Sequence, residues 1–238
     1  MMVRGAWLRL LLAASSLALS ACAPMAVQRQ AEHLVRSEGR EPTVVVMPLD
    51  VQLAELTAGG TPEPQADWTR VASRNMRAAL EDEAQHYKVR LIYYDGERGT
   101  PEDRATSLQI VKLHGLVGRT VLRHQYNETG RLPSKAGKFD WSLGRQAAAI
   151  ARSQGADYAL FLYVRDSYAS GGRVAVMVLA AVMGGYATGG TQVGFASLVD
   201  LNSGDILWFN RLARASGDLR TPAAASETIK VLVSDSLK

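Results

Sequence analysis

Cysteine is almost missing from this chain, because Cys22 is the only one among its 238 residues. An internal disulfide is therefore excluded, and packing must supply the stability of the fold. Long apolar runs are missing too. The run over residues 6–21 falls short of the about 20 apolar residues that span a bilayer, and Ser15, Ser16 and Ser20 dilute it.

Motifs for catalysis, metal binding and nucleotide binding are also absent. No Gly-x-Ser-x-Gly occurs, so the sequence has no serine nucleophile elbow. The glycine-rich stretch 184–191 comes close to a phosphate-binding loop, but Gly190 stands where that loop needs Lys, so we expect no nucleotide. The four histidines lie far apart, and none has a second His or Cys at metal-ligand spacing. We therefore expect no metal or other cofactor. His33 lies in the N-terminal segment. The other three histidines lie on expected helices, where we expect solvated or core-edge roles: His86, His114 and His124.

The N-terminus has the three-part layout of an export signal. Arg4 precedes the apolar run, and small residues lead to Cys22 in the stretch Leu19-Ser20-Ala21-Cys22. This stretch resembles the bacterial lipobox, in which cleavage occurs just before the Cys and its thiol receives a diacylglyceryl group. A plain secretory signal or an uncleaved anchor would share the apolar run. Acylation is favoured, because a lone free thiol is a liability in an oxidising compartment.

The expected organisation follows from this lipobox. Residues 1–21 are a lipoprotein signal peptide with cleavage after Ala21, residues 22–41 a lipidated tether or loosely docked helix, and residues 42–238 a periplasmic domain. Ala23 follows Cys22 where lipoproteins kept at the inner membrane commonly carry Asp, so the resemblance implies the outer membrane. Arg4 and Arg9 leave with the signal, and the formal charge falls from +4 to +2. No basic cluster indicates nucleic acid.

Apolar periodicity predicts an α/β fold: a single domain with a mixed β-sheet layered with α-helices and a C-terminal antiparallel hairpin. The hairpin is expected over residues 193–212, because Asn202 and Gly204 supply the positive φ angles of a tight turn. Loops are expected over 51–66 and 127–138. The other elements are buried strands at 43–50 and 158–164, a further strand at 89–94, and helices from 67 to about 88, from 101, from 140 to 155 and from 222, with Asp67, Thr100 and Asp140 as caps.

Three pieces of this pattern resemble the CsgG-like superfamily of bacterial lipoproteins, which takes in the curli-secretion lipoprotein, the activators of penicillin-binding proteins and PelC-like export lipoproteins. The resemblance covers the layout of most of residues 42–238. It implies a periplasmic binding or assembly module, often oligomeric, without a catalytic motif. The pieces are the strand 44–50 ending in Pro48-Leu49-Asp50, the strand Gly155-Ala156-Asp157-Tyr158-Ala159-Leu160-Phe161, and the hairpin around Asp200-Leu201-Asn202-Ser203-Gly204-Asp205.

The uncharged region 174–199 admits three interpretations. Its first ten residues, 174–183, are all apolar, which is too short for a spanning helix but long enough for a membrane β-strand. Membrane strands alternate apolar and polar faces, however, and these ten residues have no polar face. We therefore favour a buried strand or short helix of the core, followed by a glycine-rich loop, over membrane insertion. An oligomer contact is the intermediate interpretation.

These observations predict a protein that is not an enzyme. We expect an outer-membrane-anchored lipoprotein that acts as a binding or assembly module of the cell envelope. Its expected partners are the membrane, through the N-terminal lipid, and a protein partner or further copies of itself. One alternative is an oligomeric secretion-pore subunit that inserts residues 174–199. A second alternative is an envelope glycan hydrolase, which would need two acids converging in a pocket.

Overall fold

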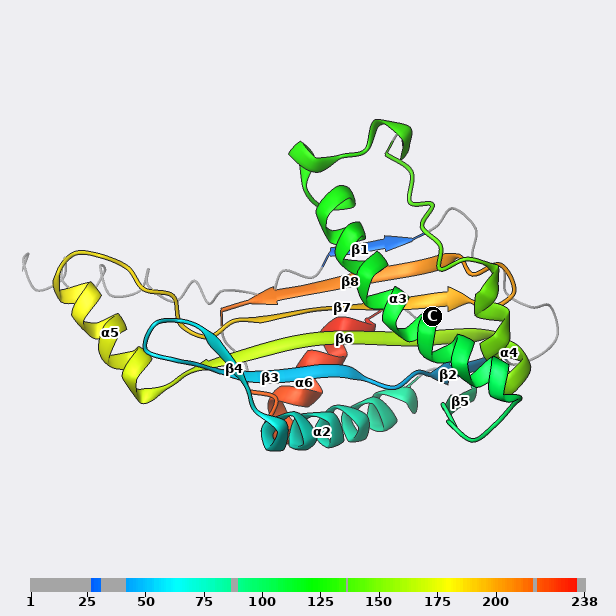
Figure 1. Cartoon of the computed structure of the whole chain (residues 1–238), viewed down its shortest axis with the longest axis horizontal. Coiled ribbons are helices and arrows are strands. Elements are labelled where there is room, and N and C mark those ends of the chain that lie inside the picture. The colour runs from blue at the N-terminus through cyan, green and yellow to red at the C-terminus, as the bar shows by residue number, and fades with distance from the viewer. Residues whose placement is uncertain (1–26, 31–41, 87–89, 136, 216–217, 235–238) are drawn as a thin grey trace, which may run out of the picture.

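The computed structural model describes residues 27–30, 42–86, 90–135, 137–215 and 218–234. In this part of the chain, one mixed sheet of eight strands carries helices on both faces, as the alternating pattern predicts (Figure 1). The strands are β1 Val27–Gln30, β2 Thr43–Val46, β3 Asp50–Leu56, β4 Pro62–Pro64, β5 Arg90–Tyr93, β6 Tyr158–Ala169, β7 Gln192–Asp200 and β8 Ile206–Arg214. The helices are α2 Ala66–Ala84, α3 Pro101–Gln125, α4 Ala148–Gln154, α5 Gly171–Val182 and α6 Pro222–Val233, with short 3₁₀ turns η1 Glu128–Gly130, η2 Pro133–Lys135 and η3 Arg145–Ala147.

The long strand β6 organises the sheet. On one side it pairs antiparallel with β7 over its first nine residues, from Tyr158 opposite Asp200 to Asp166 opposite Gln192. On the other side its beginning pairs parallel with β2 and its end with β3. The predicted hairpin of β7 and β8 is confirmed. In its turn, Gly204 adopts φ of +84° and lies so close to the Gly144 carbonyl that a Cβ would be 2.1 Å from that oxygen.

The expected strand 43–50 and loop 51–66 are both wrong in extent. The first strand ends at Val46, and the chain resumes as β3 at Asp50, which runs beside β6 to Leu56 and then turns back as β4. Pro48 has no N–H to give to a ladder, which separates the two strands. Beyond it, Val51 and Leu53 are buried on either side of the exposed Gln52, so side chains alternate as in any half-buried strand.

Part of the expected tether or helix is a strand. Residues Val27–Gln30 pair antiparallel with β8 from Arg211 to Trp208. A β8 strand without this neighbour would present a row of unpaired N–H and C=O groups, which a passing segment satisfies whatever its helical spacing. The remaining residues of the expected tether lie outside the described residues.

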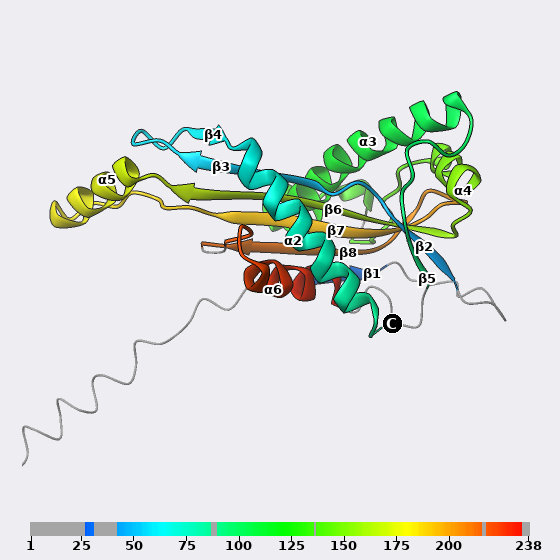
Figure 2. The ribbon, with the colours of Figure 1, turned by 90° about the horizontal axis from the view of Figure 1, so that it is seen from below.

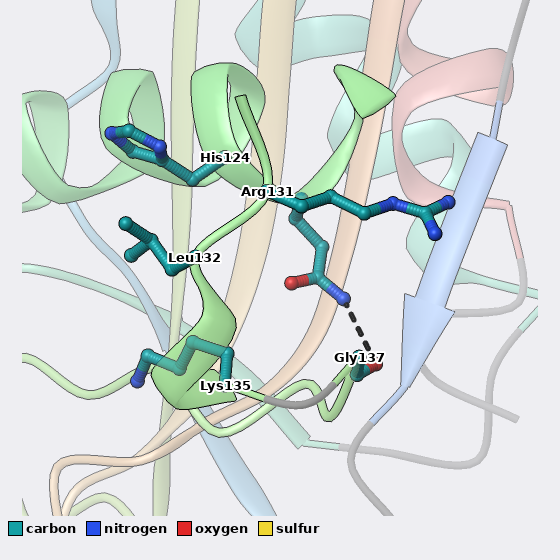
Figure 3. A pocket seen from close by; sticks show the side chains of 6 residues that line it. His124, Arg131, Leu132, Lys135 and Gly137 are labelled. Carbon is teal, nitrogen blue, oxygen red and sulfur yellow. Dashed lines mark hydrogen bonds between the residues drawn. The ribbon is translucent and has the colours of Figure 1, made fainter. Parts of the chain in front are cut away.

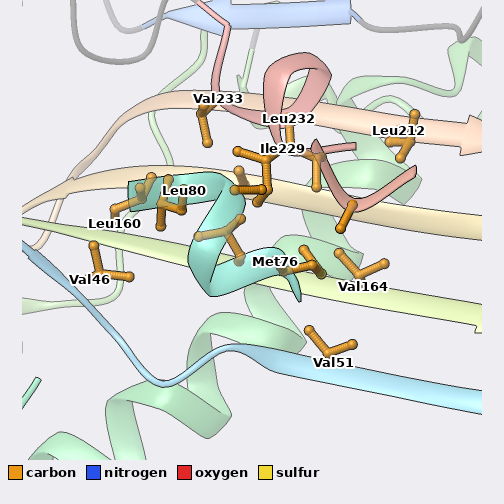
Figure 4. Close-up of a cluster of buried hydrophobic side chains, with 14 of the residues drawn as sticks. Val46, Val51, Met76, Leu80, Leu160, Val164, Leu212, Ile229, Leu232 and Val233 are labelled. Carbon is orange, nitrogen blue, oxygen red and sulfur yellow. The ribbon is translucent and has the colours of Figure 1, made fainter. Parts of the chain in front are cut away.

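Two cores lie on the two faces of the sheet, because side chains of β6 alternate between them. Leu160, Leu162 and Val164 face α2 and α6, where Met76 and Ile229 complete a buried cluster (Figure 4). The intervening residues of β6 face α3 and α4 on the other side (Figure 2). The predicted inward positions of α6, Ile229 and Leu232, are confirmed, since both are fully buried.

The cap predictions have mixed outcomes. Thr100 caps α3 as expected, because its hydroxyl accepts from the Asp103 N–H at 3.1 Å. Asp67 does not cap α2: the N-cap is Gln65, and Asp67 lies in the first turn, where its carboxylate pairs with Arg70.

Asp140 does not cap a helix either. Its carboxylate is 2.9 Å from Lys135 Nζ, and α4 begins later, at Ala148, and ends at Gly155 as predicted.

Helix α3 runs unbroken through Gly115 and Gly118, although glycines weaken helices. Gly118 is required by packing, because a Cβ there would lie 2.1 Å from the ring of Phe195 on β7. Gly115 is not required in this way. The nearest atoms to a Cβ at Gly115 are 3.7 Å away, an ordinary contact distance.

These two glycines give a matched stability test. We expect Gly118→Ala to lower the free energy of unfolding by about 1–3 kcal/mol, because the methyl group overpacks against Phe195. Gly115→Ala should leave it unchanged or raise it by up to about 1 kcal/mol, the helix-propensity gain. Urea denaturation of both variants measures the difference. Equal effects at the two positions would contradict the close approach of α3 to β7.

Candidate interaction surface

Helix α5 connects β6 to β7 and projects from one end of the sheet (Figure 1). The Ser170 hydroxyl caps it by accepting from the Arg173 N–H at 3.1 Å. None of its residues is buried. Its large apolar side chains are exposed to solvent: Val174 by 47%, Val176 by 38%, Val178 and Leu179 by 60% each, and Val182 by 80%, followed by Met183 at 77% and Tyr186 at 86%.

The favoured interpretation of residues 174–183 as core is therefore wrong. The two sheet faces are covered by α2 and α6 on one side and by α3 and α4 on the other, and α5 belongs to neither of these two cores. Of the uncharged region 174–199, only the part that belongs to β7, from residue 192 onward, contributes to the core as expected. Apolar composition did not distinguish a buried helix from an exposed one.

The base of α5 is fixed to its neighbours through Arg173. Its Nε donates to the Thr188 carbonyl at 2.9 Å and its Nη1 donates to the Ala58 carbonyl, between β3 and β4, at 3.3 Å. The returning chain is equally close, because a Cβ on Gly190 would lie 2.0 Å from the Ser167 carbonyl oxygen. Helix α5 is thus held at its base by defined hydrogen bonds, and it presents exposed apolar side chains beyond the end of the sheet.

The sequence-predicted lipidation residues, Leu19, Ser20, Ala21 and Cys22, lie outside the described residues, as does His33. Within the described ranges, no helix has both the length and the apolarity to cross a membrane.

A buried histidine–serine pair lies under α3. His114 Nε2 and Ser197 Oγ are 2.9 Å apart, and the imidazole stacks on Phe161 with ring centroids 4.6 Å apart. The expected solvated or core-edge role of His114 is wrong, because it is 2% exposed. Burial lowers the pKa of His114 to about 3, so the ring is neutral. The pair ties α3 to β7 and is closed to a substrate.

A cavity of about 190 Å³ lies at the far end of α3 (Figure 3). Its cations are engaged by acids outside the lining: Arg131 Nη2 is 3.1 Å from Glu128, and Lys135 Nζ is 2.9 Å from Asp140. No carboxylate lines it, so it lacks the two converging acids of a glycan hydrolase. The residues that line the cavity are His124, Gln125, Arg131, Leu132, Lys135 and Gly137.

The described residues contain no group of three His, Cys, Asp or Glu able to hold a metal.

One carboxylate is buried between β6, β7 and the loop before α6. Asp166 is 2% exposed, and its Oδ2 accepts from the Tyr168 hydroxyl, from Gln192 Nε2 at 3.0 Å and from the Leu219 N–H at 3.4 Å. Its Oδ1 has no hydrogen-bond partner among the described residues. Burial raises the pKa of Asp166 above its usual value, with a smaller contribution from nearby Asp218. This cluster fastens α6 to the sheet and offers no open cleft for chemistry.

The raised pKa of Asp166 predicts a pH effect on stability. A carboxyl whose pKa is raised by folding contributes stability below its unfolded value near 3.8, and this contribution is lost as pH rises through the folded pKa. Asp166→Asn removes the buried charge. We therefore expect the free energy of unfolding of this variant, relative to wild type, to increase with pH above about 4. Denaturant titrations over a pH series measure it, with the exposed Asp82→Asn as the control for loss of one charge; parallel pH curves for Asp166→Asn and wild type would contradict the assignment.

No protein-family model matches this chain, and no curated protein matches it. Among solved structures, it is similar to the PelC dodecamer from Paraburkholderia phytofirmans, with 13% identity, a TM-score of 0.39, and coverage of 88% of this chain and 97% of that one. A point variant of that dodecamer gives 15% identity, a TM-score of 0.38, and coverage of 89% and 96%. The LpoB C-terminal domain from Salmonella enterica gives 17% identity, a TM-score of 0.28, and coverage of 75% and 87%. At such TM-scores the likenesses carry no argument about function, which must come from the residues of this chain.

Proposed function

We propose that this protein is an outer-membrane-anchored lipoprotein, facing the periplasm, that acts as a non-enzymatic binding or assembly module of the cell envelope. The observation that carries the proposal is the exposed apolar surface of α5. A helix that is apolar on every side is normally buried, in a core or in a membrane. Helix α5 has no such cover within its own domain, because none of its residues is buried.

The composition of α5 fits a surface that a partner covers. After Arg173, the chain carries no charged residue until Asp200. Contiguous exposed apolar surface of this kind marks interaction sites on proteins that otherwise stay soluble. Covering it with another envelope protein or with further copies of this chain would remove Val178, Leu179 and Val182 from water.

The anchoring part of the proposal rests on the lipobox-like stretch that ends in Cys22. A diacylglyceryl group and an acyl chain at this position would hold the domain at the inner leaflet of the outer membrane. The diacylglyceryl group alone supplies two acyl chains, and two chains already give stable anchoring, which a single chain does not. The domain would then act next to the membrane, with α5 available to its partner.

A pore subunit is the second candidate function, and the exposure of α5 also favours it. Its 12 residues rise about 18 Å, which matches one leaflet of a hydrocarbon core about 30 Å thick. Residues 192–199 belong to β7 and contribute to the core, and residues 188–191 are held against Arg173 and Ser167, so only residues 174–187 would be free to insert.

Replacement of the lipidated residue tests the anchor. We expect Cys22→Ser to be exported, to lose incorporation of labelled palmitate, and to leave the membrane fraction when membranes are washed at high salt. The salt wash matters because it releases proteins held only by surface charge, whereas an acyl anchor resists it. A Cys22→Ser protein that still sediments after the wash would refute the lipid anchor.

Charge placed on α5 tests the assembly surface. Val178→Glu with Leu179→Glu should abolish assemblies larger than a monomer, or release the envelope partner that cross-links to the wild type, because carboxylates would be buried in the contact. Both side chains are 60% exposed, so the melting temperature should stay close to that of wild type. Ala78→Glu, at an exposed position of α2, controls for the effect of a carboxylate added outside α5.

The readout is native mass in mild detergent for the acylated protein and for a form that starts at Ala23. A ring that forms only with lipid or detergent would favour the pore subunit. A monomer in both forms, with a cross-linked partner lost in the α5 variant, would favour the binding module. If the α5 variant behaves like wild type in both assays, α5 is not the contact surface.

A further inference from the structure

The outer face of α3 combines two kinds of side chain. At 100° per residue, its exposed residues Leu108, Lys112, Leu116, Arg119 and Arg123 fall within an arc of about 80°. The two leucines are 55% and 58% exposed. Three cations therefore share one narrow stripe with two large apolar side chains, on the side of the helix that faces away from the sheet.

The cations of this stripe are not neutralised by any acid among the described residues. In the part of the chain that the structure describes, Lys112, Arg119 and Arg123 are exposed and form no ion pair. The sequence around the stripe is also poor in acids, because residues 104–139 contain seven Lys or Arg and a single acid, Glu128, and the acids of the first turn of α3, Glu102 and Asp103, precede Leu108 by at least five positions. Glu128 is engaged with Arg131.

Lys112, Arg119 and Arg123 form no basic cluster along the chain, because six and three other residues separate them. The helix brings them onto one face. The opposite side of the molecule differs, since α2 ends in the acidic stretch Glu81-Asp82-Glu83. Helix α2 packs together with α6, and Figure 2 shows α3 on the other side of the sheet from α6, so the acids of α2 do not lie beside the stripe.

We propose that the outer face of α3 docks on an anionic phospholipid surface, which deepens the proposed function by stating which face the domain turns toward its membrane. Lys and Arg beside an anionic leaflet each contribute attraction to lipid phosphates. Exposed leucines between them enter the boundary between headgroups and acyl chains, as in interfacial amphipathic helices. A soluble polyanion would engage the cations but leave Leu108 and Leu116 in water, so the lipid surface satisfies both halves of the stripe.

Helix α3 is built to lie on a surface without rearranging. Its inner side is fixed by Gly118 against Phe195 and by the bond between His114 and Ser197. Docking would therefore bring a pre-formed helix onto the lipid, with no cost for folding it there.

The test is co-sedimentation of the form that starts at Ala23, which contains every described residue and carries no acyl chain. It is mixed with vesicles of phosphatidylethanolamine and phosphatidylglycerol, and in parallel with vesicles of phosphatidylcholine alone. We expect binding to the anionic vesicles that weakens with salt, and little binding to the neutral ones. Reversal of the stripe, Lys112→Glu with Arg119→Glu and Arg123→Glu, should weaken the binding by roughly a hundredfold or more.

The matched control reverses three exposed cations elsewhere, Arg74→Glu with Arg90→Glu and Lys230→Glu, and so changes the net charge by the same amount. It should retain most of the binding. Leu108→Ser with Leu116→Ser should weaken binding to vesicles but leave binding to soluble polyglutamate unchanged.

Three results would overturn the proposal: equal loss in the control and the stripe variant, equal binding to neutral vesicles, or no effect of the leucine changes. The last result, together with tight binding of polyglutamate, would assign the stripe to an acidic polymer instead. Because the assay uses no acylated protein, its failure is distinct from failure of the lipid anchor at Cys22.

Discussion

The fold depends on a strand that is buried on both faces. Strand β6 pairs with β7 on one side and with β2 and β3 on the other, and its alternate side chains enter two different cores. A slip of one residue in this strand would exchange the two sets, because side chains alternate with a period of two. The same alternation places Asp166 in line with Leu160, Leu162 and Val164, which explains why a carboxylate is buried at the end of an apolar row.

Much of the fold could be predicted because the signals that specify it are local. The turn at Asn202 and Gly204 fixes the hairpin, Thr100 and Pro101 fix the start of α3, and the apolar positions of α6 fix its inward face. Strand β1 could not be predicted in this way. Its conformation depends on the edge of β8, about 180 residues further along the chain, and not on its own sequence.

The candidate site was harder to predict, for two physical reasons. Apolar composition says that a segment avoids water but does not say what covers it, so α5 was expected in the core. Charge counted along the chain does not show how a helix groups it, because Lys112, Arg119 and Arg123 share one face only in the folded helix α3. His114 is a similar case: its spacing from Ile110 and Val121 puts it on the buried side of α3. The prediction at Cys22 stays a prediction.

The short strand β4 has a consequence for how copies of this protein can meet. It lies at an edge of the sheet, next to β3, and begins and ends with Pro62 and Pro64. Proline has no N–H to donate, so this edge offers an incoming strand few donors. Growth of the sheet from one molecule into the next is therefore disfavoured at this edge, a common safeguard against fibre formation. Contacts along the β4 edge therefore depend on side chains, so an ordered assembly there would rest on surfaces whose shape and chemistry can be selected residue by residue.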